Sequence, residues 1–139
     1  DKLLLGAQQS LSALAAYGEE IGLVFQLSDD LLDIASDASG KTPGTDLREG
    51  VPTLPVLLLR ASATDEDARL LELTAGPLDD EAEVAEALTL LRAHRVMDEA
   101  RAEVARRAEV ARGYLSVLPQ GHARDALSAL CDQVAFRSA

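Results

Sequence analysis

Apolar residues recur at intervals of three and four along most of the chain, and this spacing is what most limits the possible fold. Near the start of the sequence the series reads Leu11, Leu14, Gly18, Ile21, Phe25. Such a period places residues on one face of an α-helix, which we expect to run from about Gly6 to Ser36. No stretch alternates between apolar and polar residues as a half-buried strand does. The sequence therefore predicts an all-α protein, an antiparallel helical bundle or part of one.

Helix start and stop signals divide the middle of the chain. Glycines and prolines predict a loop over residues 37–52, after which Thr53 can cap a short, largely buried helix at about 54–61. Thr64 and Asp67 resemble a capping box before "DARLLEL". The segment "LDD" at 78–80 is typical of a loop followed by a helix N-cap.

Three further apolar series predict the remaining helices. They are Val84, Leu88, Leu91; then Met97, Val104, Ala108, Ala111, Leu115, Leu118; then Leu127, Leu130, Cys131, Val134. We expect the first to end near His94 and the second to stop at Pro119 and Gly121. The chain contains no internal repeat and no flexible linker, so we expect residues 1–139 to hold no second domain.

Composition and charge exclude several classes of partner. The 139 residues are 47% hydrophobic, which argues against disorder, and their formal net charge of −11 would repel nucleic acid and anionic membranes. The single cysteine, Cys131, allows no internal disulfide and fits a reducing compartment. The longest apolar run, Leu54 to Leu59, is too short to span a bilayer, and we find no signal peptide. We therefore expect a cytoplasmic protein with no membrane span.

Three aspartates interrupt the first helix near its end. Asp29, Asp30 and Asp33 lie at positions i, i+1 and i+4. Like charges at that spacing cost a helix roughly 0.2–0.5 kcal/mol per pair, and the helix macrodipole also disfavours acids in the last turns. Carboxylates one turn apart can hold one divalent cation, and oxygen ligands suit Mg²⁺. The alternative is a solvated acidic patch, which a bare D-D-x-x-D also fits.

The loop after these acids favours the metal interpretation. Lys41 lies between glycines just past the predicted helix end, where a flexible turn can bring the ammonium group and backbone amides onto phosphate oxygens. Acids that hold cations, followed by a loop that holds an anion, suit a diphosphate bridged by metal ions.

Other residues carry weaker signals. Gly18 and Gly22 allow either close helix packing or an open pocket. His94 has no second ligand at metal spacing, so a surface or capping role is expected, and we interpret Cys131 and Met97 as core residues.

The stretches "FQLSDDLLD" and "GKTPGTDLREGVPTLP" together closely resemble the second aspartate-rich motif of the trans-polyprenyl diphosphate synthases. The joint pattern, F-Q-x-x-D-D-x-x-D, then G-K-x-x-G-x-D-L, then T-L-P, spans about thirty residues. The resemblance continues more weakly in "YGEEIGLVFQ" and in the C-terminal helices, so it covers most of the chain. It implies a bundle of the isoprenoid synthase type around a deep apolar cavity, with two aspartate-rich motifs facing each other across its mouth.

The resemblance also implies an activity and a set of site residues. Such enzymes use Mg²⁺ to ionise an allylic prenyl diphosphate, which isopentenyl diphosphate then attacks. The metal ligands would be Asp29, Asp30 and Asp33. The residues next to the substrates or their diphosphates would be Phe25, Gln26, Lys41 and Asp46. Catalysis would depend on Asp29, Asp30, Lys41 and Gln26.

Two departures from the family pattern stand out. Val51 occupies a position where many members carry a second lysine. The sequence also contains no first aspartate-rich motif, so we expect a C-terminal half that is inactive alone and needs an N-terminal half from the same or another chain. Because the family is commonly dimeric, the resemblance predicts a homodimer. The alternatives are a noncatalytic subunit or truncated paralogue of the same fold, and a class I terpene cyclase, although the G-K-x-x-G-x-D loop favours elongation over cyclisation.

Overall fold

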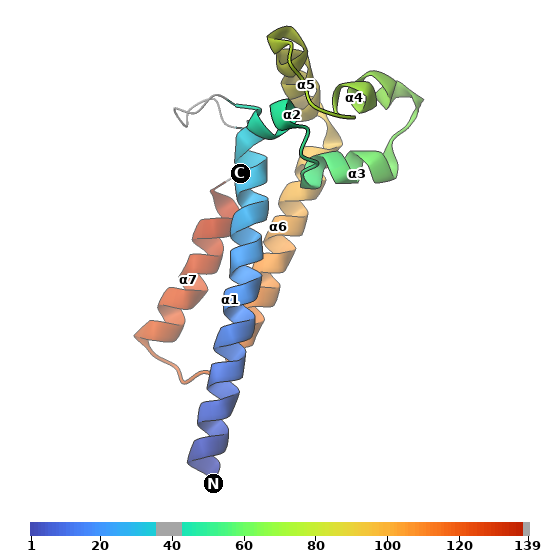
Figure 1. The fold of residues 1–139 in the computed structure, drawn as a ribbon. Helices are drawn as coiled ribbons and strands as arrows, with labels where there is room; N and C mark the ends of the chain where they lie inside the picture. Colours follow the sequence, from blue (N-terminus) through green and yellow to red (C-terminus); the bar gives the residue numbers. More distant parts are fainter. Residues whose placement is uncertain (36–42, 138–139) are drawn as a thin grey trace. The chain divides into compact units, whose positions relative to one another are not determined.

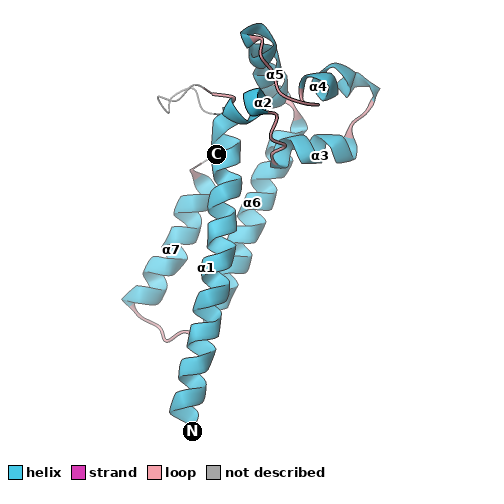
Figure 2. Ribbon diagram, in the orientation of Figure 1, coloured by secondary structure: helices cyan, strands magenta, loops and turns pink. Residues whose placement is uncertain are grey.

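The computed structural model describes residues 1–35 and 43–137, which are helical with short connections and contain no strand (Figures 1 and 2). The all-α prediction is therefore confirmed. The helices are α1 (Lys2–Ala35), α2 (Thr45–Glu49), α3 (Leu54–Ser62), α4 (Ala68–Leu73), α5 (Glu81–Ala93), α6 (Arg95–Gly113) and α7 (His122–Phe136), with 3₁₀ turns η1 (Asp65–Asp67) and η2 (Tyr114–Val117). Within the described ranges, every helix is too short or too polar to span a bilayer.

The described chain forms two compact units. The first unit combines residues 1–28 with residues 103–137, and the second unit consists of residues 29–102. Both α1 and α6 contribute to each unit.

The first unit consists of three helical segments, from α1, α6 and α7, that lie side by side (Figure 1). The Tyr17 hydroxyl donates to the Leu127 carbonyl at 2.7 Å, which joins α1 to α7. Arg107 forms an ion pair with Glu20 at 3.2 Å, which joins α6 to α1. Cys131 is fully buried, as predicted for a core residue, and burial raises the pKa of its thiol.

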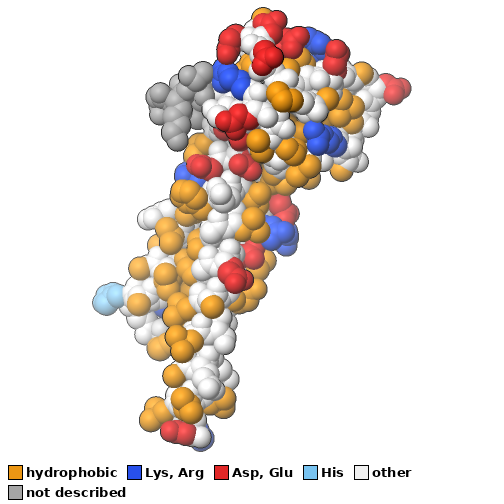
Figure 3. Space-filling view, viewed as in Figure 1, with side chains coloured by type: hydrophobic (Ala, Val, Ile, Leu, Met, Phe, Trp, Pro, Cys, Tyr) orange, Lys and Arg blue, Asp and Glu red, His pale blue; other side chains and the backbone are white. Residues whose placement is uncertain are grey.

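The apolar face predicted for α1 is largely exposed. Leu11 is 68% exposed, Leu14 39% and Phe25 48%, whereas the buried positions of this helix include Tyr17 and Val24. Figure 3 shows hydrophobic side chains at the surface along α1 and α7. The helix was thus predicted correctly, and sequence spacing alone does not tell which of its faces is covered.

The glycines of this helix also lie in open space. A Cβ atom built at Gly18 or Gly22 meets nothing within 4 Å in the described chain. No described residue packs closely against these two glycines. The described chain therefore favours an open pocket over close helix packing at these positions.

The second unit packs the end of α1 against short helices. Leu31 and Ile34 of α1 are buried together with Leu59 of α3. The predicted loop at 37–52 contains helix α2, so that prediction was wrong for residues 45–49, while residues 36–42 lie outside the described chain. Thr53 does occupy the N-cap of α3, although its side chain makes no capping bond. Leu57 is 49% exposed, so α3 is buried on one side only.

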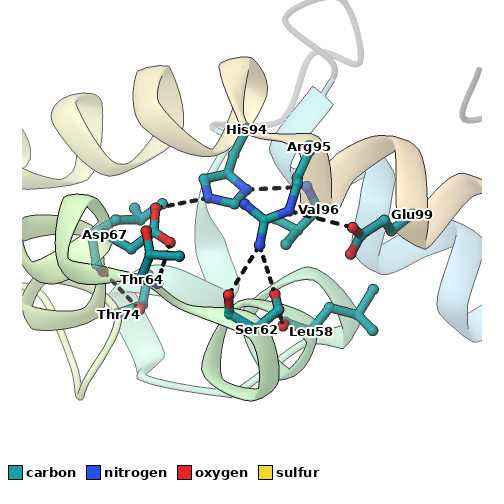
Figure 4. Close-up of polar contacts among 10 residues, drawn as sticks. Leu58, Ser62, Thr64, Asp67, Thr74, His94, Arg95, Val96 and Glu99 are labelled. Carbon is teal, nitrogen blue, oxygen red and sulfur yellow. Dashed lines mark hydrogen bonds and ion pairs between the residues drawn. The ribbon is translucent and has the colours of Figure 1, made fainter.

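A polar cluster joins three elements of the second unit (Figure 4). The predicted capping box is confirmed, since the Thr64 amide donates to the Asp67 carboxylate at 3.0 Å and the reciprocal bond is also present. The other oxygen of Asp67 lies 2.9 Å from Nε2 of His94. Because the Val96 amide donates to Nδ1 of His94 at 3.1 Å, the neutral ring carries its hydrogen on Nε2 and donates it to Asp67. The capping role predicted for His94 is therefore confirmed.

Candidate metal and diphosphate site

The last turns of α1 place the motif aspartates within the second unit. Asp29 is exposed, whereas Asp30 and Asp33 are half-buried. One carboxylate oxygen of Asp33 accepts the Thr45 amide and the other accepts the Asp46 amide, both at 3.1 Å. Asp33 thus ties the end of α1 to the start of α2.

The residue before helix α2 is Gly44, whose backbone conformation starts the helix. Gly44 precedes α2 in the left-handed region, with φ of 86°, and its amide donates to the main-chain carbonyl of Asp33 at 3.0 Å. Glycine has no side chain to cap the first amides of the helix, so the Asp33 carboxylate does so from α1 instead. Both the main chain and the side chain of Asp33 therefore hold this turn in place.

Burial and neighbouring acids oppose the ionisation of Asp30 and Asp46. The pKa of Asp30 is raised to about 6, first by burial and then by the charges of Asp46, Asp29 and Asp33. The pKa of Asp46 is raised as well, first by burial and then by Asp33, Glu49 and Asp29. This second unit therefore concentrates negative charge around the end of α1 and the start of α2.

The arginine of α2 forms its hydrogen bonds with other groups than these acids, although, after the hydrogen bond with Glu81, the charge of Asp33 also helps to raise its pKa. Arg48 pairs with Glu81 at 2.7 Å and also donates to the Pro43 carbonyl at 2.6 Å. A cation bound beside Asp30 would relieve the repulsion, and a set of donors made only of oxygen atoms suits a hard divalent ion.

The acids do not form a complete cage by themselves. Among the described residues, no three His, Cys, Asp or Glu side chains converge at metal-ligating distance. A metal ion held here would therefore take its other ligands from water, substrate or further parts of the protein, which is the usual way in which proteins bind Mg²⁺.

The structure describes two of the three remaining predicted site residues. Phe25 and Gln26 belong to the first unit and are exposed. Val51 is 48% exposed in the turn that follows α2. Lys41 lies outside the described residues, so its predicted contact with diphosphate stays a prediction.

Two contacts of the predicted site residues could not be expected from the sequence patterns used above. The first is that of Asp33, which was predicted only as a metal ligand, although its partners Thr45 and Asp46 follow a glycine in a manner typical of a helix start. The second is that of Arg137, which contacts Phe25 from 112 residues away, a separation that leaves no local signal in the sequence.

Comparison with known proteins gives consistent results. Residues 2–91 match the family model described as Polyprenyl synthetase. Nonaprenyl diphosphate synthase of Mycobacterium tuberculosis is 47% identical over 131 residues, which cover 93% of this chain and 39% of the relative. Short chain isoprenyl diphosphate synthase of Methanothermobacter thermautotrophicus is 38% identical over 136 residues, which cover 95% of this chain and 41% of the relative.

A solved structure shares the fold. The crystal structure of geranylgeranyl pyrophosphate synthase from Corynebacterium glutamicum, complexed with calcium and isoprenyl diphosphate, matches with a TM-score of 0.82 and 38% identity over 91% of this chain and 40% of that one. The chain spans about two fifths of the length of these relatives. With a family model that matches well over half of its residues and relatives this similar, the chain belongs to the polyprenyl synthetase family.

Proposed function

We propose that this chain supplies the second aspartate-rich motif and the diphosphate loop of a prenyltransferase. The enzyme would condense an allylic prenyl diphosphate with isopentenyl diphosphate in the presence of Mg²⁺. The observation that carries the proposal is the set of acids Asp29, Asp30, Asp33 and Asp46 at the junction of α1 and α2, where burial and the neighbouring charges raise the pKa of Asp30 and of Asp46. The similarity to nonaprenyl and short chain isoprenyl diphosphate synthases supports the same reaction class.

Each acid has its own task in this proposal. Asp29 and Asp30 hold the cations. Burial and then repulsion raise the pKa of Asp30, and relief of that repulsion by a bound cation contributes to the affinity. Asp33 fixes the first amides of α2 and leaves its remaining lone pairs for a water or a metal ion. Asp46 is thereby held close enough to influence Asp30, where it can orient a metal-bound water.

Bound Mg²⁺ would neutralise the diphosphate as it leaves the allylic carbon. Lys41 would add a positive charge to the same diphosphate. Phe25 and Gln26 would lie beside the condensing substrates. The use of calcium and isoprenyl diphosphate in the related Corynebacterium structure supports a divalent ion together with a diphosphate in this family.

The exposed stripe of α1 fits this assignment. Leu11, Leu14 and the open positions Gly18 and Gly22 form a surface of apolar and small residues. We propose that an N-terminal half, in the same or another chain, covers this stripe and completes an apolar cavity for the prenyl chain. The complete enzyme would then be a cytoplasmic homodimer.

The test is turnover by the complete protein that contains this chain. It is incubated with Mg²⁺, an allylic diphosphate and labelled isopentenyl diphosphate, and we expect a labelled, longer prenyl diphosphate. Asp29→Ala should lower turnover at least about a hundredfold without unfolding the protein. The reason is that the variant would hold less tightly the metal ions that neutralise the leaving diphosphate. Asp79→Asn, at an exposed aspartate of the same unit, is the matched control and should leave turnover unchanged.

Other outcomes would identify the alternatives. A folded complete protein that yields no product would indicate a noncatalytic subunit. A hydrocarbon formed from the allylic diphosphate without isopentenyl diphosphate would indicate a cyclase. An active Asp29→Ala protein would refute the site assignment.

A further inference from the structure

At the C-terminal end of α7, the side chain of Arg137 contacts one turn of α1. Nε of Arg137 donates to the Ser28 hydroxyl at 3.0 Å, and a terminal guanidinium nitrogen donates to the Phe25 carbonyl at 2.8 Å. The guanidinium carbon also lies 4.1 Å from the centroid of the Phe25 ring. All three residues belong to the first unit. One side chain therefore contacts both the main chain and the ring of Phe25.

These contacts use properties that are particular to arginine. The planar guanidinium can stack on an aromatic face while its edge donates hydrogen bonds, which an ammonium group cannot do in the same geometry. Ser28 is fully buried, so its hydroxyl requires a partner, and Arg137 supplies one. Arg137 also stands at the C-cap of α7, where positive charge is favourable.

The ring that Arg137 covers is partly open to solvent. Phe25 is 48% exposed in the described chain, and an exposed aromatic side chain can adopt several rotamers. The stacked guanidinium restricts one face of this ring. Phe25 begins the sequence F-Q-x-x-D-D, so the restrained ring stands at the head of the motif.

We propose that Arg137 is a positioning residue that holds the Phe25 ring in the orientation needed by the condensing substrates. This inference rests on the proposed function, which places Phe25 beside the condensing substrates. Arg137 acts through Phe25, and its loss should affect the use of the condensing substrates more than the stability of the fold.

The competing explanation is that Arg137 only anchors α7 to α1. A matched control separates the two roles. Arg112 of α6 also anchors α7, since it donates to the Ser128 carbonyl at 2.9 Å and pairs with Asp132, yet none of these contacts involves Phe25. Arg112→Ala should loosen α7 without freeing the ring.

The experiment uses the complete protein and steady-state kinetics. Arg137→Ala should raise the KM for at least one of the two condensing substrates about fivefold to tenfold, because a Phe25 ring that is less often in the binding orientation lowers the apparent affinity by that fraction. Arg137→Lys should recover the melting temperature but only part of the KM, because lysine keeps the charge and loses the planar fork. Phe25→Leu should show a similar KM, and the double variant should lose little more, since the two residues act as one unit.

A second readout does not require turnover. With 4-fluorophenylalanine incorporated, the ¹⁹F signal of Phe25, identified by its loss in Phe25→Leu, should shift in Arg137→Ala and stay unchanged in Arg112→Ala. An active protein in which Arg137→Ala matches Arg112→Ala in KM and in the ¹⁹F signal overturns this inference alone. A wild-type protein that is inactive but keeps the Arg137-dependent signal overturns the proposed function, and the substrate role of Arg137 with it.

Discussion

The Asp33 carboxylate accepts a hydrogen bond from the main-chain amide of Asp46 at 3.1 Å, across 13 positions of the sequence. One acid of the motif thus determines where a second acid stands. The charge of Asp46 in turn contributes to the raised pKa of Asp30. The bonds that build the start of α2 therefore also build the electrostatic field of the candidate site.

Replacing Asp33 should destabilise this junction. Asp33→Ala removes the acceptor for the amides of Thr45 and Asp46, and loss of a helix cap costs about 0.5–2 kcal/mol. Hydrogen exchange at these two amides should accelerate, while Asp29→Ala should leave them protected. Unchanged exchange in Asp33→Ala would show that the carboxylate does not hold α2.

Replacing Asp30 should have the opposite effect in the absence of metal. Its pKa of about 6 lies above the usual value of about 3.9, so its charge lowers stability above pH 6 and the cost disappears as the pH falls toward 4. In EDTA at pH 7.5 we expect Asp30→Asn to melt at a higher temperature than the wild type, with the difference shrinking at lower pH. Mg²⁺ should raise the melting temperature of the wild type more than that of the variant. A less stable Asp30→Asn protein in EDTA would contradict the repulsion argument.

The Asp67 cluster should show the reverse pH dependence. Hydrogen bonds from the Thr64 amide and His94, together with the nearby charge of Arg95, lower the pKa of Asp67 below its usual value. Its contribution to stability is therefore present above that usual value and is lost as the pH falls through the lowered one. Asp67→Asn should melt earlier than the wild type at pH 7, and the two curves should converge below about pH 4. The exposed neighbour Asp65 provides the control Asp65→Asn, and equal losses in both variants would argue against the cluster.

Replacing Gly50 or Gly18 by alanine should change the free energy of unfolding in opposite directions. Gly50 has φ of 74°, and a Cβ there would lie 2.6 Å from the Pro77 nitrogen, so Gly50→Ala should cost at least about 1–3 kcal/mol. Gly18 lies inside α1 with nothing near a new Cβ, so Gly18→Ala should stabilise the helix by about 0.5–1 kcal/mol. Urea unfolding measures both changes. A loss of stability in Gly18→Ala would mean that another part of the complete protein packs closely there.

Local signals predicted the local features of this fold. The capping box at Thr64 and the N-cap at Asp80, which accepts the Ala82 amide at 2.9 Å, were both evident in the sequence. The helix around Val84, Leu88 and Leu91 was predicted for the same reason, since its buried residues recur with the helical period.

Features that depend on distant partners could not be predicted in this way. The covered face of α1 depends on its tertiary neighbours, so the spacing of Leu11 and Leu14 did not show that both would be exposed in the described chain. Helix α2 is only five residues long and lies between glycines, where local propensity does not distinguish a helix from a turn. The contact between Arg137 and Phe25 joins residues 112 positions apart, and no periodic pattern of residues in the sequence indicates it.

The most direct test of the account is isothermal titration calorimetry of the complete, folded protein with an allylic prenyl diphosphate. If divalent ions on Asp29 and Asp30 hold the diphosphate, binding should appear in Mg²⁺, vanish in EDTA and be strongly weakened by Asp29→Ala. Binding that is equal with and without Mg²⁺, or no binding under either condition, would contradict the central claim.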